Sequence, residues 1–321
     1  MRTSALSAKV LALHAAVVVI LFALNFVLPA YHHSVLARVM LLAVFAMGYN
    51  ILFGYAGLLS LGHAMFFSAG LYGAGLTAYH LGWSMPAGFA AGIACGALLA
   101  LVIGVLALRT TGVAFMIVTM MFAQVFYLLT FYFAEWTRGD GGIVLGRETR
   151  RIVVGDVHLD MTEPTTRYML ALAVFSIVLF ITLIAVRSAF GRVLVAIREN
   201  EERTRMLGFD TFANKLAAVV LSGTICATAG AAYALLFGYI GSTFAGVQYS
   251  ILPLLWVLLG GAATTLGPFV GTLFMYYVID ITSSYTSAYL LIVGAALILL
   301  VLFFPKGILG TIRERWVKWL P

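Results

Sequence analysis

Long apolar runs are the feature that most constrains how this chain can fold. Val10–Leu28 and Leu170–Val186 are two of them, and runs of about 18 or more apolar residues are typical of helices that cross a lipid bilayer. Hydrophobic residues make up 63% of the 321 residues, whereas a soluble domain is about half apolar. A soluble all-α protein with such helices would expose far too much apolar surface. The sequence therefore predicts a polytopic membrane protein.

Apolar runs and helix breakers divide the chain into about ten candidate transmembrane helices. Proline starts or stops a helix at low cost, and Pro29, Pro86 and Pro268 lie at or near predicted edges. We expect an all-α membrane helix bundle that forms one domain, 1–321, with re-entrant or broken segments. The predicted spans are 10–29, 36–53, 63–82, 86–108, 112–133, 168–186, 214–238, 249–264, 267–284 and 287–304.

The placement of the basic residues predicts the orientation of these spans. With the N-terminus inside the cell, 13 of the 19 basic residues fall on inner segments, while the short outer loops have almost none. Five arginines between 138 and 167 lie in or directly after the long loop 134–166, where six acids offset them. This orientation places both termini, the loop 187–213 and the tail 306–321 in the cytoplasm, and 134–166 outside. The net charge of +7 is thereby explained without a nucleic-acid partner.

Glycines at four-residue spacing predict close helix packing. They recur at Gly88, Gly92 and Gly96, and again at Gly267 and Gly271. In lipid, small residues at this spacing let two helix backbones approach each other. We interpret them as packing positions in a tight bundle, with a partner subunit as a further candidate for such contacts.

The segment 187–210 is unusually charged, with five arginines and four acids in a chain that is 10% charged. Asn200 is a suitable N-cap, with Glu201 and Glu202 in the first turn. Gly208 is suited to end the helix, and a helix of about two turns is too short to be stable alone. We expect it to dock on another surface, with these contact candidates: Arg198, Glu199, Asn200, Glu201, Glu202, Arg203, Met206, Leu207 and Gly208. The alternative is an ordinary charged inner loop.

The chain carries neither a GxxxxGK[ST] motif nor a dinucleotide-binding fingerprint. ATP-driven transport would therefore need a separate ATPase. Glu202 and Gly208 have the spacing of the EAA-x3-G loop of ABC-importer permeases, although Arg203 and Thr204 replace its two alanines and the downstream Leu-Pro is absent. The string FGRVLVAIRENEERTRMLG closely resembles the cytoplasmic loop of LivM-type branched-chain amino-acid ABC transporter permeases. Further similar blocks are NILFGYAGLLSLGHAMFFSAGLYGAG, TTGVAFMIVTMMFAQ, LLWVLLGGAATTLGPFVGT and FFPKGILG.

The resemblance covers most of the chain and implies a type II ABC-importer-like permease in the bacterial inner membrane. In this family the permease pairs with a homologous second permease, two cytoplasmic ATPases and a periplasmic substrate-binding protein. The implied ATP and Mg are bound by the ATPases, so that this chain would hold no cofactor or metal and would not be an enzyme. The implied substrates are branched-chain or related amino acids, with urea or another small solute as the alternative.

Two Gly-rich stretches are candidate broken-helix joints. They are GYAGLLSLGHAMF at 54–66 and GGAATTLGP at 260–268. Non-helical backbone at membrane depth is tolerated where it is buried in protein or lines a cavity, and half-helix ends can present dipoles to a zwitterion. Ser60 is positioned to cap the helix after the first joint. The candidate translocation-path residues are Asn50, Tyr55, Ser60, His63 and Gln124, each with plain interhelical hydrogen bonding as its alternative.

Three further segments carry structural predictions. RRIVVGDVHLD at 150–160 predicts a β-hairpin around Gly155–Asp156, in a cap that contacts the binding protein or in a plain lid. Asp280, the one acid inside a predicted span, is interpreted as an interfacial cap with Thr282 and Ser283, and a substrate role is the alternative. The tail 306–320 predicts an interfacial helix with Ile308, Ile312, Trp316 and Trp319 on its apolar face.

Two other classes of function fit the sequence less well. A stand-alone carrier usually holds titratable or ion-coordinating groups near the bilayer midplane, and the predicted spans offer almost none. An integral-membrane enzyme would need clustered His, Asp or Cys. The six histidines show no such spacing, and the two cysteines fall inside apolar runs.

Overall fold

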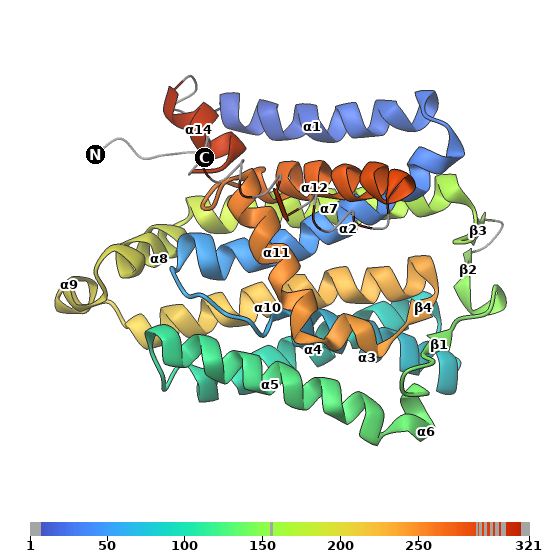
Figure 1. The fold of residues 1–321 in the computed structure, drawn as a ribbon, viewed down its shortest axis with the longest axis horizontal. Helices are drawn as coiled ribbons and strands as arrows, with labels where there is room; N and C mark the ends of the chain where they lie inside the picture. Colours follow the sequence, from blue (N-terminus) through green and yellow to red (C-terminus); the bar gives the residue numbers. More distant parts are fainter. Residues whose placement is uncertain are drawn as a thin grey trace.

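The computed structural model describes residues 8–154, 157–286 and 306–315, with isolated positions between 288 and 302. Most long helices run along the longest axis of the molecule, as Figure 1 shows. These are α1 (Ala8–Val27), α2 (Ala30–Asn50), α3 (His63–His80), α4 (Met85–Ala107), α5 (Gly112–Tyr132), α7 (Pro164–Arg187), α10 (Thr211–Phe237) and α12 (Gly267–Tyr285). The shorter elements are η1 (Ile51–Tyr55), α6 (Ala134–Thr137), η2 (Glu148–Arg150), α8 (Ala189–Glu199), α9 (Glu201–Met206), η3 (Ser242–Ala245), α11 (Val247–Gly260) and α14 (Ile308–Arg315).

Six of the described helices are long and apolar enough to cross a membrane. They are α1, α2 with its continuation η1, α4, α5, α7 and α10. In α2 the most apolar stretch is 94% buried, against 17% in α5, so that α2 is the central helix and α5 lies at the periphery. Helices α3, α11 and α12 occupy three further predicted spans but are shorter or less apolar. The predicted span 287–304 falls outside the described residues, apart from isolated positions, and the count of ten stays a prediction.

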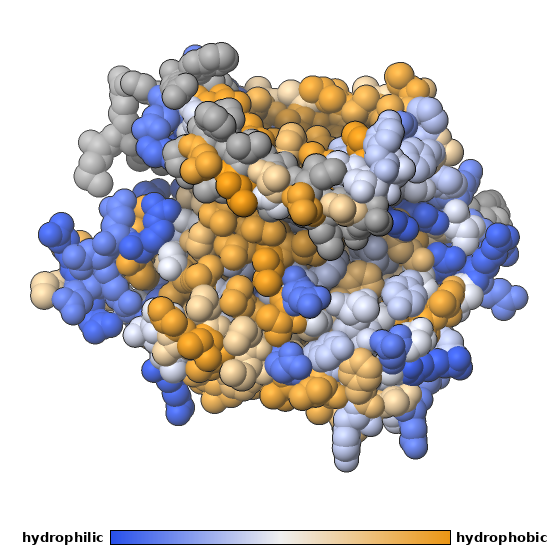
Figure 2. Space-filling view, viewed as in Figure 1, coloured by the Kyte–Doolittle hydropathy of each residue, from blue (hydrophilic) through white to orange (hydrophobic). Residues whose placement is uncertain are grey.

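The surface is divided into zones of different polarity. Figure 2 shows a broad apolar band across the middle of the visible face and hydrophilic side chains gathered toward the two ends. One polar end is formed by α8 and α9, and the other lies over the strands. Such an apolar band between polar ends is the surface that a membrane-spanning bundle presents to lipid.

Glycines lie where helices cross most closely. A Cβ built on Gly92 of α4 would lie 2.5 Å from the carbonyl oxygen of Gly70 in α3, and one on Gly96 would lie 2.0 Å from the Ala227 Cβ in α10. A Cβ on Gly271 of α12 would lie 1.9 Å from a backbone oxygen of α11. Any side chain at these positions would push the helices apart. Gly88 and Gly267 also face neighbouring backbone.

Short strands mark the end of the bundle opposite α8 and α9 (Figure 1). Strands β2 (Arg151–Val154) and β3 (Val157–Asp160) pair antiparallel, with Arg151 opposite Asp160. The predicted hairpin is therefore confirmed, although its turn residues lie outside the described chain. A second antiparallel pair, β1 (Ile143–Val144) with β4 (Tyr239–Ile240), was not predicted and ties the long loop to the end of α10.

Two predictions near the C-terminus have different outcomes. The Asp280 carboxylate accepts a hydrogen bond from the Tyr31 hydroxyl at 2.8 Å. This bond links α12 to α2. Of the two residues predicted to form a cap with Asp280, Ser283 donates to the Asp280 backbone carbonyl and not to its carboxylate. Helix α14 confirms the first part of the predicted tail helix, and Trp316 and Trp319 lie outside the described residues.

Candidate functional site

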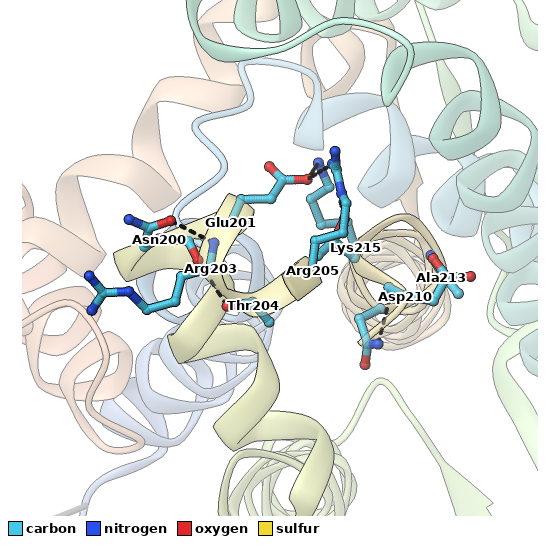
Figure 3. Close-up of polar contacts among 10 residues, drawn as sticks. Asn200, Glu201, Arg203, Thr204, Arg205, Asp210, Ala213 and Lys215 are labelled. Atoms are coloured by element: carbon cyan, nitrogen blue, oxygen red, sulfur yellow. Dashed lines mark hydrogen bonds and ion pairs between the residues drawn. The ribbon is translucent and has the colours of Figure 1, made fainter. Parts of the chain in front are cut away.

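The charged segment forms two consecutive helices, α8 and α9, at one end of the bundle (Figure 1). The Asn200 side chain accepts a hydrogen bond from the Arg203 backbone N–H at 2.8 Å (Figure 3). Glu201 and Glu202 occupy the first turn of α9, where carboxylates complement the helix dipole. Gly208 follows with a φ of +90°, a conformation that favours glycine. The predicted capped two-turn helix is confirmed.

Helix α9 is held on the first turns of α10 by an ion pair. The Lys215 Nζ lies 2.7 Å from a Glu201 carboxylate oxygen, and Arg205 lies 3.3 Å from the same oxygen (Figure 3). Burial raises the pKa of the Glu201 carboxyl, but the hydrogen bond and charge of Lys215 outweigh it and leave that pKa below its ordinary value. Thr204, which is buried, donates to the Asn200 carbonyl at 2.9 Å. These contacts give a marginal helix a fixed position.

The tip of this segment presents apolar side chains to its surroundings. Met206 is 85% exposed and Leu207 is 71% exposed, and Phe209 and Phe212 nearby are also exposed. Among the predicted contact residues Glu199, Glu202 and Arg203 are exposed as well. An apolar patch surrounded by charges, at a polar end of the bundle, has the composition of a surface that another protein covers.

The first predicted joint is a break between α2 and α3. Helix α2 loosens into the π-helical turn η1, and residues 56–62 then run without regular helix to His63. The Arg198 guanidinium of α8 donates to the Gly54 carbonyl at 2.5 Å. Gly57 has a φ of +72° and packs against the stem of Arg198, where a Cβ would collide with it. The charged segment therefore contacts the joint directly.

The second predicted joint, between α11 and α12, touches the first through one side chain. The Asn50 oxygen accepts from the Ala263 backbone N–H at 3.0 Å, and its amide donates to the Thr264 carbonyl at 2.9 Å. Ala263 has a φ of +56° and Gly261 a φ of +118°, so that the backbone between the helices is irregular. Asn50 satisfies polar backbone groups that the break leaves without helical partners.

The other path candidates lie in different surroundings. The buried His63 Nε2 lies 2.9 Å from the Ser222 hydroxyl, which in turn donates to the Gly48 carbonyl at 2.6 Å. Tyr55 is buried, whereas Gln124 faces outward from α5. The predicted Ser60 cap is wrong, because Gly62 is the N-cap of α3 and makes no side-chain capping bond. Ser60 instead accepts from the Gly62 N–H at 3.2 Å, a turn that precedes the helix.

A cleft of about 560 Å³ opens where α8, the second joint and α14 meet. Three basic side chains, those of Arg198, Lys306 and Arg313, help to line it, and the Arg313 guanidinium donates to the Ala263 carbonyl at 3.2 Å. The lining residues are Arg198, Leu258, Ala262, Ala263, Thr264, Lys306, Gly310, Arg313 and Glu314. Within the described ranges, no three His, Cys, Asp or Glu side chains gather in a way that would hold a metal.

Sequence reasoning missed the partners that hold these residues. Lys215 was counted only among the basic residues of the inner segments. A lysine at the start of an apolar span, 14 residues after Glu201, is the signal that indicates an ion pair with that glutamate. The Gly54 carbonyl and the Ala263–Thr264 backbone carry no side-chain signal, since any residue type supplies these atoms.

Comparison with known proteins identifies the family. The model of the branched-chain amino acid transport system permease component matches residues 31–302, which is most of the chain. The chain belongs to this family. A high-affinity branched-chain amino acid transport system permease protein, LivM of Salmonella typhimurium, is 25% identical over 322 residues, 94% of this chain and 75% of that protein.

Two further relatives of this permease family have similar names. The Escherichia coli LivM protein is 26% identical over 298 residues, 86% of this chain and 69% of that protein. A probable LivM protein of Methanocaldococcus jannaschii is 36% identical over 85 residues, 26% of this chain and 25% of that protein. No solved structure matches the chain. Family membership together with the six long apolar helices makes the chain a multi-pass membrane protein.

Proposed function

We propose that this chain is the membrane-spanning permease subunit of an ATP-driven ABC importer for branched-chain or related amino acids. The family and the names of the relatives support the substrate class. In this proposal the chain does no covalent chemistry, and ATP with Mg is bound by two separate cytoplasmic ATPases. A homologous second permease, a periplasmic binding protein and membrane lipid are the other partners.

The single observation that carries the proposal is that α9 is fixed to the bundle while apolar side chains at its end stay exposed. Its backbone is capped by Asn200 and its carboxylate is tied to Lys215, while Met206 and Leu207 remain exposed. A helix that is anchored on one side and apolar on the other is suited to fit a groove on a partner. We assign that partner as an ATPase subunit and α8–α9 as the coupling segment.

A route from this surface into the bundle supports the same function. Arg198 joins α8 to the first joint, and Asn50 joins the first joint to the second. Both joints interrupt helices, and the ends of interrupted helices can present backbone dipoles to a substrate. A movement of α9 on nucleotide-driven closure would thereby reach both joints through side chains that are already in contact.

The proposal extends to membrane topology. The chain lies in a bacterial inner membrane with about ten spans in a type II importer-like arrangement, and both termini are cytoplasmic. In this orientation the loop 134–166 faces the periplasm, and α8, α9 and α14 face the cytoplasm.

The coupling role is tested by a paired substitution at the tip of α9. We expect Met206→Glu with Leu207→Glu to insert in the membrane and to retain the second permease, but to lose the ATPases on affinity purification. The matched control is Val144→Glu, because Val144 is 71% exposed at the opposite end of the molecule. Retention of the ATPases by the double variant would contradict the assigned role of α9.

A further inference from the structure

Three arginines gather at the end of the bundle that carries the hairpin. The guanidinium carbons of Arg38 from α2 and Arg167 from α7 lie 5.0 and 5.1 Å from the centroid of the same ring, Phe237 at the end of α10. The Arg150 guanidinium packs against Gly238, the next residue. Arg167 lies close enough to the other two for their charges to repel. We call Arg38, Arg150 and Arg167 the arginine cluster.

Within the described part of the chain, no acid is paired with the arginine cluster. The acid that acts on it electrostatically is Asp160, which is already paired with Arg151 at 3.2 Å. Among the residues that the structure describes, none of the three guanidiniums forms an ion pair. Gathering three cations without a counter-charge is unfavourable, so the arrangement calls for an anion.

Backbone carbonyls satisfy only part of the cluster. Arg167 donates to the carbonyls of Met161 and Thr162, both at 3.3 Å. Arg150 Nε is buried and has no acceptor within the described chain. Arg38 interacts with the Tyr276 hydroxyl and is otherwise exposed on its face of α2. A planar guanidinium with free donors binds a carboxylate in a two-pronged geometry.

An aromatic wall adjoins the cluster. The Tyr233 ring lies 4.7 Å from that of Phe237 and 5.2 Å from that of Phe244. These three rings are only partly buried. Guanidiniums beside accessible aromatic surface match a small molecule that has a carboxylate at one end and an apolar side chain at the other.

We propose that the arginine cluster and this wall form a binding site for the α-carboxylate and apolar side chain of a free amino acid. The site lies at the end of the permease that faces the binding protein, and its assignment to an amino acid rests on the proposed function. Arg38 is the principal carboxylate ligand because it is exposed, while Arg150 adds charge from the hairpin side. The aromatic rings contact the side chain of the amino acid.

The test is equilibrium binding of radiolabelled L-leucine to the tagged full chain in lipid nanodiscs, with its co-purifying partners and without binding protein. We expect unlabelled leucine to displace the label and leucinamide, which lacks the carboxylate, to fail. Arg38→Gln should weaken binding by about tenfold or more, the loss of one hydrogen bond to a charged group. Arg38→Lys should restore part of it. Arg138→Gln is the matched control, because Arg138 lies in the same loop as Arg150 but donates to the Tyr79 hydroxyl, and it should bind as the wild type does.

Several outcomes would overturn the proposal. They are equal binding by Arg38→Gln and wild type, equal displacement by leucinamide, or no binding of leucine by the wild-type chain. If Arg38→Gln binds leucine normally but loses stimulation of ATP hydrolysis by the binding protein, the cluster receives acidic side chains of that protein. If Arg38→Gln fails to fold, the same leucine-binding measurement on Arg150→Gln tests the proposal. Failure of the proposed function is seen separately, as absence of ATPases from the wild-type preparation.

Discussion

The guanidinium of Arg198 donates a hydrogen bond of 2.5 Å to the backbone carbonyl oxygen of Gly54. This bond joins the last turn of α8 to the π-helical turn in which α2 ends. One turn earlier, Asn50 holds the backbone of Ala263 and Thr264 in the second joint. The side chains of Arg198 and Asn50 therefore connect three segments that lie far apart in the sequence. In the proposed function, a movement of α9 would enter the bundle at this place.

Replacement of Arg198 tests this connection. We expect Arg198→Ala to retain the ATPases on purification and to hydrolyse ATP, while amino-acid uptake falls by about tenfold because one charge-assisted hydrogen bond is lost. Arg198→Lys should recover part of the uptake. The measurement is uptake per ATP hydrolysed in proteoliposomes.

The matched control for this variant is Arg192→Ala. Arg192 is an exposed arginine of the same helix, and its side chain donates to the Arg187 carbonyl at 3.4 Å. Uptake per ATP that is the same in Arg198→Ala and Arg192→Ala would show that the contact with Gly54 does not transmit movement.

Asn50 is expected to be a stability determinant. Asn50→Leu would leave the Ala263 N–H and the Thr264 carbonyl buried without partners, at a cost of about 2–4 kcal/mol. We expect a lower thermal unfolding temperature in detergent for this variant. Gln124→Leu should change the unfolding temperature little, because the Gln124 side chain is exposed and forms no hydrogen bond among the described residues. Equal unfolding temperatures for the two variants would contradict the role of Asn50.

The pair of Glu201 with Lys215 predicts an asymmetry between two substitutions. Glu201→Gln leaves the buried ammonium of Lys215 without a counter-charge, whereas Lys215→Met leaves a carboxylate that is partly exposed and still near Arg205. We expect the first to cost about 1–3 kcal/mol and the second less. Thermal unfolding of both variants measures the difference, and a larger loss for Lys215→Met would refute this account of the anchor.

The same pair predicts a pH dependence. The pKa of the folded Glu201 carboxyl is lowered from its ordinary value of 4.5, so its contribution to stability is fully present above that value. The contribution is lost as the pH falls through the lowered pKa. The difference in unfolding temperature between wild type and Glu201→Gln should therefore be constant near neutral pH and shrink below pH 4.5.

Gly208 is required because of its backbone conformation, and not because a side chain would lack space there. Its φ is +90°, and a built Cβ would meet no atom within 4 Å. We expect Gly208→Val to strain the end of α9 by about 1–2 kcal/mol and to reduce uptake, while Gly208→Asn is tolerated better. Gly146→Val is the control, since Gly146 also has open space but no positive φ. Normal uptake by Gly208→Val would remove Gly208 from the coupling segment.

The sequence predicted elements that local chemistry specifies. The capped helix α9 followed from Asn200, the two glutamates and Gly208, and the hairpin followed from alternation around one turn. The apolar runs predicted the long helices because burial in lipid requires that composition.

Contacts of side chains with distant backbone atoms could not be predicted in the same way. Arg198 was assigned to the coupling segment, but its acceptor is a carbonyl 144 residues away. Asn50 was a path candidate with interhelical bonding as the alternative, and nothing in its neighbours indicated residues 263–264. The arginine cluster escaped notice because Arg38, Arg150 and Arg167 lie on three elements and were counted only as outer charge.

Purification of the tagged chain from gently solubilised membranes tests the central claim most directly. The account predicts that two ATPases and a second permease co-purify, and that the assembly moves a branched-chain amino acid into liposomes only when ATP is supplied. Recovery of the chain alone, carrying amino acids into liposomes without ATP, would contradict the account and identify a stand-alone carrier.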